Sequence, residues 1–239
     1  KDRKTTESFA KQIQLAQQKN VDLLALTGDQ VNYPSPTSIA FVAEEVKKSG
    51  LPHIYTAGNH DWHYEGMEGS SDQLRETWQE KLSPLYEGHN PSHTAIELNG
   101  LCFVTIDNAT YQVNETQLAF YREQISRNLP TILLMHIPLS LPSLRNPGDP
   151  IGFGNPAWGW DRDKNYEIER RQRWPKSGNQ PSTFTFYDTV CNTPNLIAVL
   201  CGHTHRNQVT PINDHAYQYQ TLAGFQGGYR HITFCPLSE

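Results

Sequence analysis

Four short polar clusters in this 239-residue chain combine side chains that bind divalent metals. They are Gly28-Asp29, Gly58-Asn59-His60-Asp61, His136 and Gly202-His203-Thr204-His205. Together they offer carboxylate and amide oxygens and imidazole nitrogens, and they contain no cysteine thiolate. Such a mixed oxygen and nitrogen set suits Mn, Fe, Zn, Co or Ni and argues against a structural zinc knuckle. We therefore expect these clusters to form a metal site.

Each cluster follows a short apolar run that is typical of a buried strand. The expected strands cover residues 21–27, 51–57, 131–135 and 196–201. Open α/β sheets place their ligands just beyond the carboxyl ends of parallel strands. If these strands lie side by side, the four clusters meet at one edge of the sheet. His203 and His205 would face the same side of an extended segment, because side chains alternate along it.

The rest of the pattern indicates a mixed α/β protein. Helical spacing of apolar residues and capping residues predict helices over 7–19, 36–49 and 73–82, and another from Asn114 through Ser126. Strands 94–98 and 101–107 are expected to form a hairpin around Asn99-Gly100. Strands 217–223 and 229–234, around Gly227-Gly228, are expected to close the chain. Strands that alternate with helices about every 30 residues are typical of α/β units.

Each cluster also has a plainer interpretation. Gly-Asp after a strand is common in turns, so Asp29 alone is a weak metal signal. Asn59-His60-Asp61 could likewise form a turn with an Asp-paired surface histidine. His136 could be a core histidine whose polar atoms are satisfied. All four clusters occur together, each at a strand end, and this joint occurrence favours the metal site.

The order of the clusters resembles that in the calcineurin-like metallophosphoesterase superfamily. The motifs of that family run D-x-H, G-D-x-x, G-N-H-[DE], a lone histidine and G-H-x-H. The last four occur here as Gly28-Asp29-Gln30-Val31, Gly58-Asn59-His60-Asp61, His136 and Gly202-His203-Thr204-His205. The resemblance implies a two-sheet αββα sandwich with residues 1–239 as one domain. It also implies metal-dependent hydrolysis of a phosphomonoester or phosphodiester.

The resemblance further implies a dinuclear site with two divalent metal ions. Asp29 would bridge the two ions, and His205 would serve the first of them. The second metal would be held by Asn59, His136 and His203. Two such cations neutralise phosphoryl oxygens and lower the pKa of a bridging water, which supplies hydroxide for in-line attack.

Two further residues would have catalytic roles by the same resemblance. His60 would face the scissile phosphoester without binding metal, and Asp61 would fix the orientation of its ring. A histidine near the leaving oxygen can donate a proton, a step worth roughly 10²–10⁴ in rate. A carboxylate on the far ring nitrogen holds the tautomer and raises the basicity of the imidazole.

One motif of the family is missing ahead of Gly28. No D-x-H occurs there, and Asp2-Arg3-Lys4 directly precedes an expected helix, whereas the motif should end a first strand. Either the chain begins after its own first strand, or it is a divergent member with a weakened first metal site. In both cases Asp29 and His205 are too few for a tight first site. We therefore expect one well-bound metal and little or no hydrolysis of phosphoesters.

The segment 139–181 differs from the rest of the chain because it is rich in proline and glycine and holds three of the five tryptophans. Long irregular segments inside compact domains are usually functional loops or disordered, and the aromatic content favours a lid over the site. Trp158, Trp160, Arg170 and Arg171 could stack a base and grip a phosphate, which would suit a nucleotide-like substrate. The alternative is that the tryptophans pack a lid core and the arginines pair with nearby glutamates.

Charge and hydropathy exclude some classes of function. The formal charge of −5 disfavours nucleic acid as a partner, and with it a nuclease of the same superfamily. No apolar stretch approaches the roughly 18 residues of a membrane span. The remaining rival is a pseudoenzyme that keeps the fold as a metal-binding module. Asp107, at the end of an expected strand, could lie near the site or form a turn; the compartment and the oligomeric state stay open.

Overall fold

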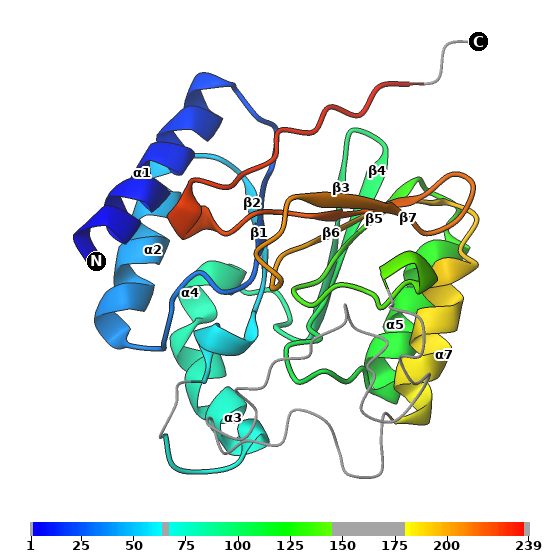
Figure 1. The fold of residues 1–239 in the computed structure, drawn as a ribbon, viewed down its shortest axis with the longest axis horizontal. Coiled ribbons are helices and arrows are strands. Elements are labelled where there is room, and N and C mark those ends of the chain that lie inside the picture. Colours follow the sequence, from blue (N-terminus) through cyan, green and yellow to red (C-terminus); the bar gives the residue numbers. More distant parts are fainter. Residues whose placement is uncertain (1, 64–66, 145–179, 237–239) are drawn as a thin grey trace.

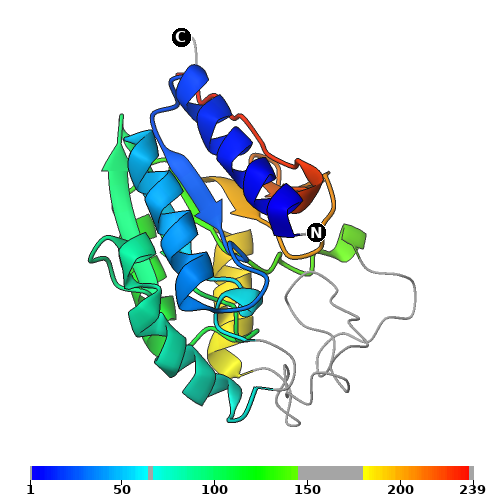
Figure 2. The same cartoon turned by 90° about the vertical axis from the view of Figure 1, so that its left-hand side faces the viewer.

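The computed structural model describes residues 2–63, 67–144 and 180–236, which form two β-sheets with helices outside them (Figure 1). This arrangement confirms the expected two-sheet α/β fold. The smaller sheet pairs β1 (Leu24–Thr27) and β2 (His53–Thr56) in parallel. Helices α1 (Asp2–Gln18) and α2 (Pro36–Ser49) lie side by side over it (Figure 2).

The larger sheet contains six strands in the order β3-β4-β5-β6-β8-β7. They are β3 (His93–Leu98), β4 (Leu101–Ile106), β5 (Thr131–Leu134), β6 (Leu196–Cys201), β7 (Gln208–Pro211) and β8 (Tyr217–Gln220). The neighbours β4, β5, β6 and β8 run parallel, and β3 and β7 are antiparallel edge strands. The carboxyl ends of β4, β5 and β6 therefore meet at one edge of this sheet.

The other helices lie outside the sheets, where α5 and α7 cover the larger one (Figure 1). They are α3 (Ser71–Lys81), α4 (Ser83–Tyr86), α5 (Glu115–Ser126) and α7 (Pro181–Cys191), with 3-10 turns η1 (Asn59–Asp61), η2 (Pro142–Leu144) and η3 (Gly224–Gln226). Among the helices of the described part of the chain, none is long and apolar enough to span a membrane.

Side chains that alternate in direction along the strands fill the layers on both sides of the larger sheet. In β4, Cys102, Val104 and Ile106 belong to the core beneath α5 and α7. Phe103 belongs to a second core that also contains Ile54 of β2 and so joins the two sheets. This division follows from the two-residue period of a strand, which sends successive side chains to opposite faces. The packing holds the two sheets in fixed positions beside each other.

Local signals account for the helix boundaries that the sequence predicts well. Helix α2 begins after Ser35, whose hydroxyl accepts a hydrogen bond from the Ser38 N–H, and Pro36 occupies its first turn. It ends at Gly50, which adopts the left-handed conformation with φ 66°. Asn114 caps α5 by accepting from the Gln117 N–H, as expected. Capping side chains and a terminal glycine satisfy backbone groups that the helix leaves unpaired.

The expected strand over 229–234 is wrong. Its alternating pattern does bury one face in part, and Phe234 packs edge-on against Phe103. However, the described residues provide no backbone ladder for it, and Arg230 instead anchors the segment by donating to the Gln208 and Gln220 carbonyls. An extended conformation needs a hydrogen-bonding neighbour to become a strand, and periodicity does not reveal one. Helix α7 and strand β7 are elements that the sequence reasoning missed.

Candidate metal centre

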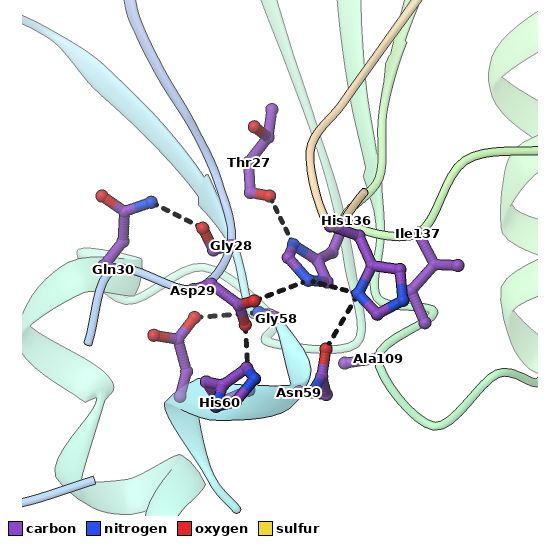
Figure 3. Close-up of polar contacts among 12 residues, drawn as sticks. Thr27, Gly28, Asp29, Gln30, Gly58, Asn59, His60, Ala109, His136 and Ile137 are labelled. Atoms are coloured by element: carbon purple, nitrogen blue, oxygen red, sulfur yellow. Dashed lines mark hydrogen bonds and ion pairs between the residues drawn. The ribbon is translucent and has the colours of Figure 1, made fainter. Parts of the chain in front are cut away.

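The predicted clusters come together where parallel strands of both sheets end (Figure 3). Asp29 follows β1 and Asn59 follows β2, in the smaller sheet. His136 follows β5 and His203 follows β6, in the larger sheet. The site therefore forms between the two sheets, at the carboxyl ends of their strands, where α/β folds commonly bind ligands.

Four potential metal-binding atoms contact one another in this cluster. Asp29 Oδ2 lies 3.1 Å from His136 Nε2, and His203 Nδ1 lies 3.2 Å from the same nitrogen. Asn59 Oδ1 is 3.1 Å from His203 Nδ1. Asp29, His136 and His203 each offer one such atom, and these three atoms lie within 4.8 Å of one another. We call Asp29, Asn59, His136 and His203 the metal cluster.

The chemistry of these atoms fits a divalent cation. His136 Nδ1 lies 2.9 Å from the Thr27 carbonyl oxygen, to which its N–H donates, so Nε2 carries a lone pair. Asp29 Oδ2, Asn59 Oδ1 and His136 Nε2 are then acceptors that point toward one another. Such an arrangement is repulsive unless a proton or a cation lies among the acceptors. A carboxylate, an amide oxygen and imidazole nitrogens suit a metal of borderline or hard character.

Electrostatics couple Asp29 to His136. Desolvation disfavours the charged Asp29 carboxylate, but the charge and hydrogen bond of His136 outweigh it and hold the pKa of Asp29 below its ordinary value. Burial likewise opposes protonation of His136, and the adjacent Asp29 more than compensates and raises the pKa of the imidazole. The carboxylate is therefore ionised at neutral pH and available as a ligand.

Two residues of the metal cluster adopt a strained backbone conformation. Asp29 and His203 have φ angles of 52° and 63°, in the left-handed region that non-glycine residues rarely adopt. His205 also lies in this region, with φ 52°. The conformation costs on the order of 1 kcal/mol for each residue. Strain of this kind is typical of sites where the fold must aim a side chain.

Gly58 is required for the close approach of the β1 and β2 loops. A Cβ atom at this position would overlap the carboxylate and the backbone nitrogen of Asp29. We expect Gly58→Ala to displace Asp29 and to weaken metal binding about 10- to 100-fold, as for other changes behind a ligand. Titration with Mn²⁺ would measure this effect. Gly202→Ala is the matched control, because its Cβ would meet nothing closer than 3.6 Å; equal losses in both variants would contradict the argument.

Asp61 does not orient the His60 ring, contrary to the expectation from the motif. It is completely buried, and its oxygens accept from the Val31 N–H at 3.0 Å, the Gly58 N–H at 2.8 Å and the Tyr55 hydroxyl at 2.9 Å. Desolvation, assisted by the charge of Asp29, raises the pKa of Asp61 to about 6. Asp61 therefore ties the loops after β1 and β2 together.

His60 is held by backbone groups instead. Its Nδ1 lies 2.9 Å from the Asn32 carbonyl oxygen, and its backbone N–H donates to Asp29 Oδ1 at 2.9 Å. The ring is only partly buried. A ring whose Nδ1–H donates to a carbonyl leaves Nε2 as the nitrogen that this contact does not occupy. A carbonyl partner cannot be recognised from sequence, because every residue carries one.

His205 is not among the residues whose ligand atoms meet in the metal cluster. It is exposed, and its ring meets the edge of Phe225 at a centroid distance of 5.3 Å. Desolvation lowers the pKa of His205, although the charge of Asp29 partly opposes this. The charge of Asp29 therefore acts on His205. The ring nitrogens of His205 nevertheless do not belong to the group of ligand atoms formed by Asp29, His136 and His203.

The turn after β4 contributes Asn108, which the sequence reasoning did not assign to the site, beside Asp107, for which it left a turn as one of two interpretations. Asn108 is fully buried, and its Oδ1 accepts from the His136 and Ile137 N–H groups at 3.2 and 3.1 Å. Its Nδ2 donates to the Ile137 carbonyl at 2.7 Å. Asp107 forms the turn, accepting from the Ala109 N–H at 2.9 Å and pairing with Arg75 at 2.6 Å. The available signal was a polar side chain that closely follows a strand, as Asp29 does in Gly28-Asp29.

The predicted substrate-binding residues are not placed. Trp158, Trp160, Arg170 and Arg171 lie outside the described residues, as does most of the segment 139–181 that was expected to form a lid. The described start of that segment includes the short turn η2.

The fold has counterparts among solved structures. A dimetal phosphatase from Danio rerio has a TM-score of 0.58 at 9% identity, with 92% of this chain and 78% of that chain covered. The protein TT1561 of Thermus thermophilus has a TM-score of 0.54 at 12% identity, with 92% and 84% covered. At these identities the likeness concerns the fold alone. No curated protein matches the sequence significantly.

The family itself is established from sequence over most of the chain. The family model described as calcineurin-like phosphoesterase matches residues 3–207. This range contains all four polar clusters and the strands that end at them. The chain therefore belongs to the calcineurin-like phosphoesterase family.

Proposed function

We propose that this chain hydrolyses a phosphomonoester or phosphodiester with a divalent cation held by Asp29, Asn59, His136 and His203. Membership of the family supports metal-dependent phosphoester hydrolysis in general. The observation that carries the specific assignment is the convergence of acceptor atoms, 3.1–3.2 Å apart, at the carboxyl ends of strands from both sheets. The cation would supply Lewis-acid polarisation of the phosphoryl oxygens and a more acidic water.

The residues around the cluster have distinct roles in this proposal. His60 is not part of the cluster, and its ring is anchored at Nδ1 by Asn32. We assign to its Nε2 the proton that goes to the leaving oxygen. Asp29 contributes both to metal binding and to the placement of His60. Its Oδ2 faces the cluster, and its Oδ1 accepts the His60 N–H. Asp61 acts only through the loops that it ties together.

We propose one cation per chain at the metal cluster and a small phosphorylated compound as substrate. His205 alone adds one further donor near Asp29, which is too few for a second tight site. The formal charge of −5 supports a small substrate over a nucleic acid, whose backbone calls for a basic surface.

The proposal predicts that the protein loaded with Mn²⁺ hydrolyses p-nitrophenyl phosphate or bis(p-nitrophenyl) phosphate, and that chelation abolishes the reaction. His60→Gln should retain the metal but lower kcat roughly 10²–10⁴-fold, because it removes the proton donor. Steady-state kinetics and elemental mass spectrometry of the same samples separate the two effects. His89→Gln, a change at an exposed histidine, serves as the control.

Four outcomes would count against the proposal. Absence of bound metal would contradict the cluster assignment, and two metals per chain would contradict the proposed stoichiometry. One bound metal with no turnover of any phosphoester would favour a metal-binding module over an enzyme. Equal kcat in His60→Gln and the unmodified protein would remove His60 from the mechanism.

A further inference from the structure

The turn after β4 contacts two predicted metal ligands from one place. Asn108 Oδ1 accepts hydrogen bonds from the backbone N–H groups of His136 and Ile137, as described above. Three residues further on, Tyr111 approaches His203, with its hydroxyl 3.4 Å from His203 Nε2. The two rings also pack edge to face, with centroids 5.8 Å apart and planes at 78°. One short segment thus touches ligands that belong to two different strands.

The fold holds Tyr111 firmly in this position. Its side chain is only 2% exposed, and its backbone N–H donates to the Asn108 carbonyl at 2.8 Å. Tyr111 has a φ of 63°, in the left-handed region. A bulky residue rarely adopts this conformation. The conformation is maintained only where contacts with the surrounding structure impose it. The strain therefore points to a requirement for this side chain at this place.

The chemistry of His203 explains what Tyr111 would do. His203 faces the metal cluster with Nδ1, which lies 3.1 Å from Asn59 Oδ1 and 3.2 Å from His136 Nε2. A neutral imidazole has one N–H, so Nδ1 has a lone pair for a cation only when the proton is on Nε2. The phenolic oxygen of Tyr111, 3.4 Å from Nε2, can accept that proton. The Thr27 carbonyl stands in the same relation to Nδ1 of His136.

We propose that Tyr111 is a positioning residue whose hydroxyl oxygen accepts the Nε2 proton of His203, and thereby keeps Nδ1 free and directed into the metal cluster. Partners that hold the far nitrogen of a ligating histidine fix both its tautomer and its ring orientation. The proposal rests on the proposed function insofar as the cluster binds metal. The tautomer of His203 is a property of the metal-free chain as well.

Tyr111→Phe tests this assignment because it removes the hydroxyl and keeps the ring. We expect Mn²⁺ or Zn²⁺ affinity, measured by chelator competition, to fall about 10- to 100-fold. Tyr121→Phe is the matched control, since Tyr121 is equally buried and its hydroxyl bonds Thr193 at 3.3 Å, outside the cluster. That variant should bind metal as the unmodified protein does. Unchanged affinity in Tyr111→Phe would overturn the proposal.

A second measurement follows the tautomer directly in metal-free protein. In metal-free protein, Nε2–H of His203 can donate to Tyr111, whereas Nδ1–H can donate to Asn59 Oδ1, 3.1 Å away. Nitrogen-15 chemical shifts of His203, assigned by their absence in His203→Gln, should therefore show a larger Nε2–H population in the unmodified chain than in Tyr111→Phe. Equal Nε2–H populations in the two proteins would overturn the role of Tyr111. If the unmodified chain binds no metal, the proposed function fails, and the tautomer measurement still decides the role of Tyr111.

Discussion

Asp29→Asn is expected to weaken binding of divalent metal by roughly 10²–10³-fold and to reduce phosphoester hydrolysis in proportion. The substitution preserves the shape of the side chain but removes the negative charge beside His136 Nε2. Charge neutralisation at a metal is worth several kcal/mol, and each 1.4 kcal/mol corresponds to a factor of ten. Isothermal titration with Mn²⁺ and Zn²⁺ would measure the loss. Asp22→Asn, at an exposed aspartate near the same strand, provides the control.

The same substitution should lower stability only moderately in the presence of a chelator. The introduced amide would donate to His136 Nε2, and its oxygen could still accept the His60 N–H that Asp29 Oδ1 accepts now. Loss of the charge interaction with His136 that lowers the pKa of Asp29 should reduce the free energy of unfolding in urea by about 1–3 kcal/mol at neutral pH. A large loss of stability would mean that Asp29 is mainly structural. Metal affinity equal to that of the unmodified protein would exclude Asp29 as a ligand.

Asp61→Ala is expected to destabilise the protein by roughly 3–6 kcal/mol, a large part of the 5–15 kcal/mol typical of a domain. The change leaves three buried donors without their acceptor: the Val31 and Gly58 N–H groups and the Tyr55 hydroxyl. Each unsatisfied buried group costs about 1–3 kcal/mol. Urea denaturation followed by circular dichroism would show the loss as a lower midpoint.

Two companion variants separate this effect from a general loss of charge. Asp61→Asn keeps one oxygen acceptor and should lie between Asp61→Ala and the unmodified protein. Asp214→Ala removes an exposed carboxylate and should change stability by less than about 0.5 kcal/mol. If Asp61→Ala unfolds at the same urea concentration as Asp214→Ala, the buried network around Asp61 does not hold the loops together.

The elements that the sequence predicts well are those with local signals. Helix α2 has its boundaries at a capping serine and a left-handed glycine, and both lie within the segment itself. The hairpin of β3 and β4 turns at Asn99-Gly100, where both residues adopt positive φ, as the pair predicts. The segment 229–234 shows the limit of prediction from local sequence signals. Its alternation is visible in sequence, but a hydrogen-bonding partner is a property of the fold.

The candidate site likewise has residues that the sequence predicts and contacts that only the fold determines. Asp29, Asn59, His136 and His203 are visible in sequence because each follows an apolar run that must be a buried strand. Their convergence follows once the strands are parallel. The hydrogen-bonding partner of each side chain cannot be predicted in this way. Asp61 was expected at His60 from the resemblance to the family, yet its carboxylate accepts hydrogen bonds from Val31 and Tyr55.

The family, the α/β class and the residue types at the site can all be read from the amino-acid sequence, because strand periodicity and short motifs are local properties of the chain. Which nitrogen of each histidine faces the cluster depends instead on tertiary packing. The nitrogen on the far side of the ring contacts the Thr27 carbonyl in His136 and the Tyr111 hydroxyl in His203. These two partners come from segments up to 109 residues away from the histidines they contact, so their proximity depends on how the two sheets pack.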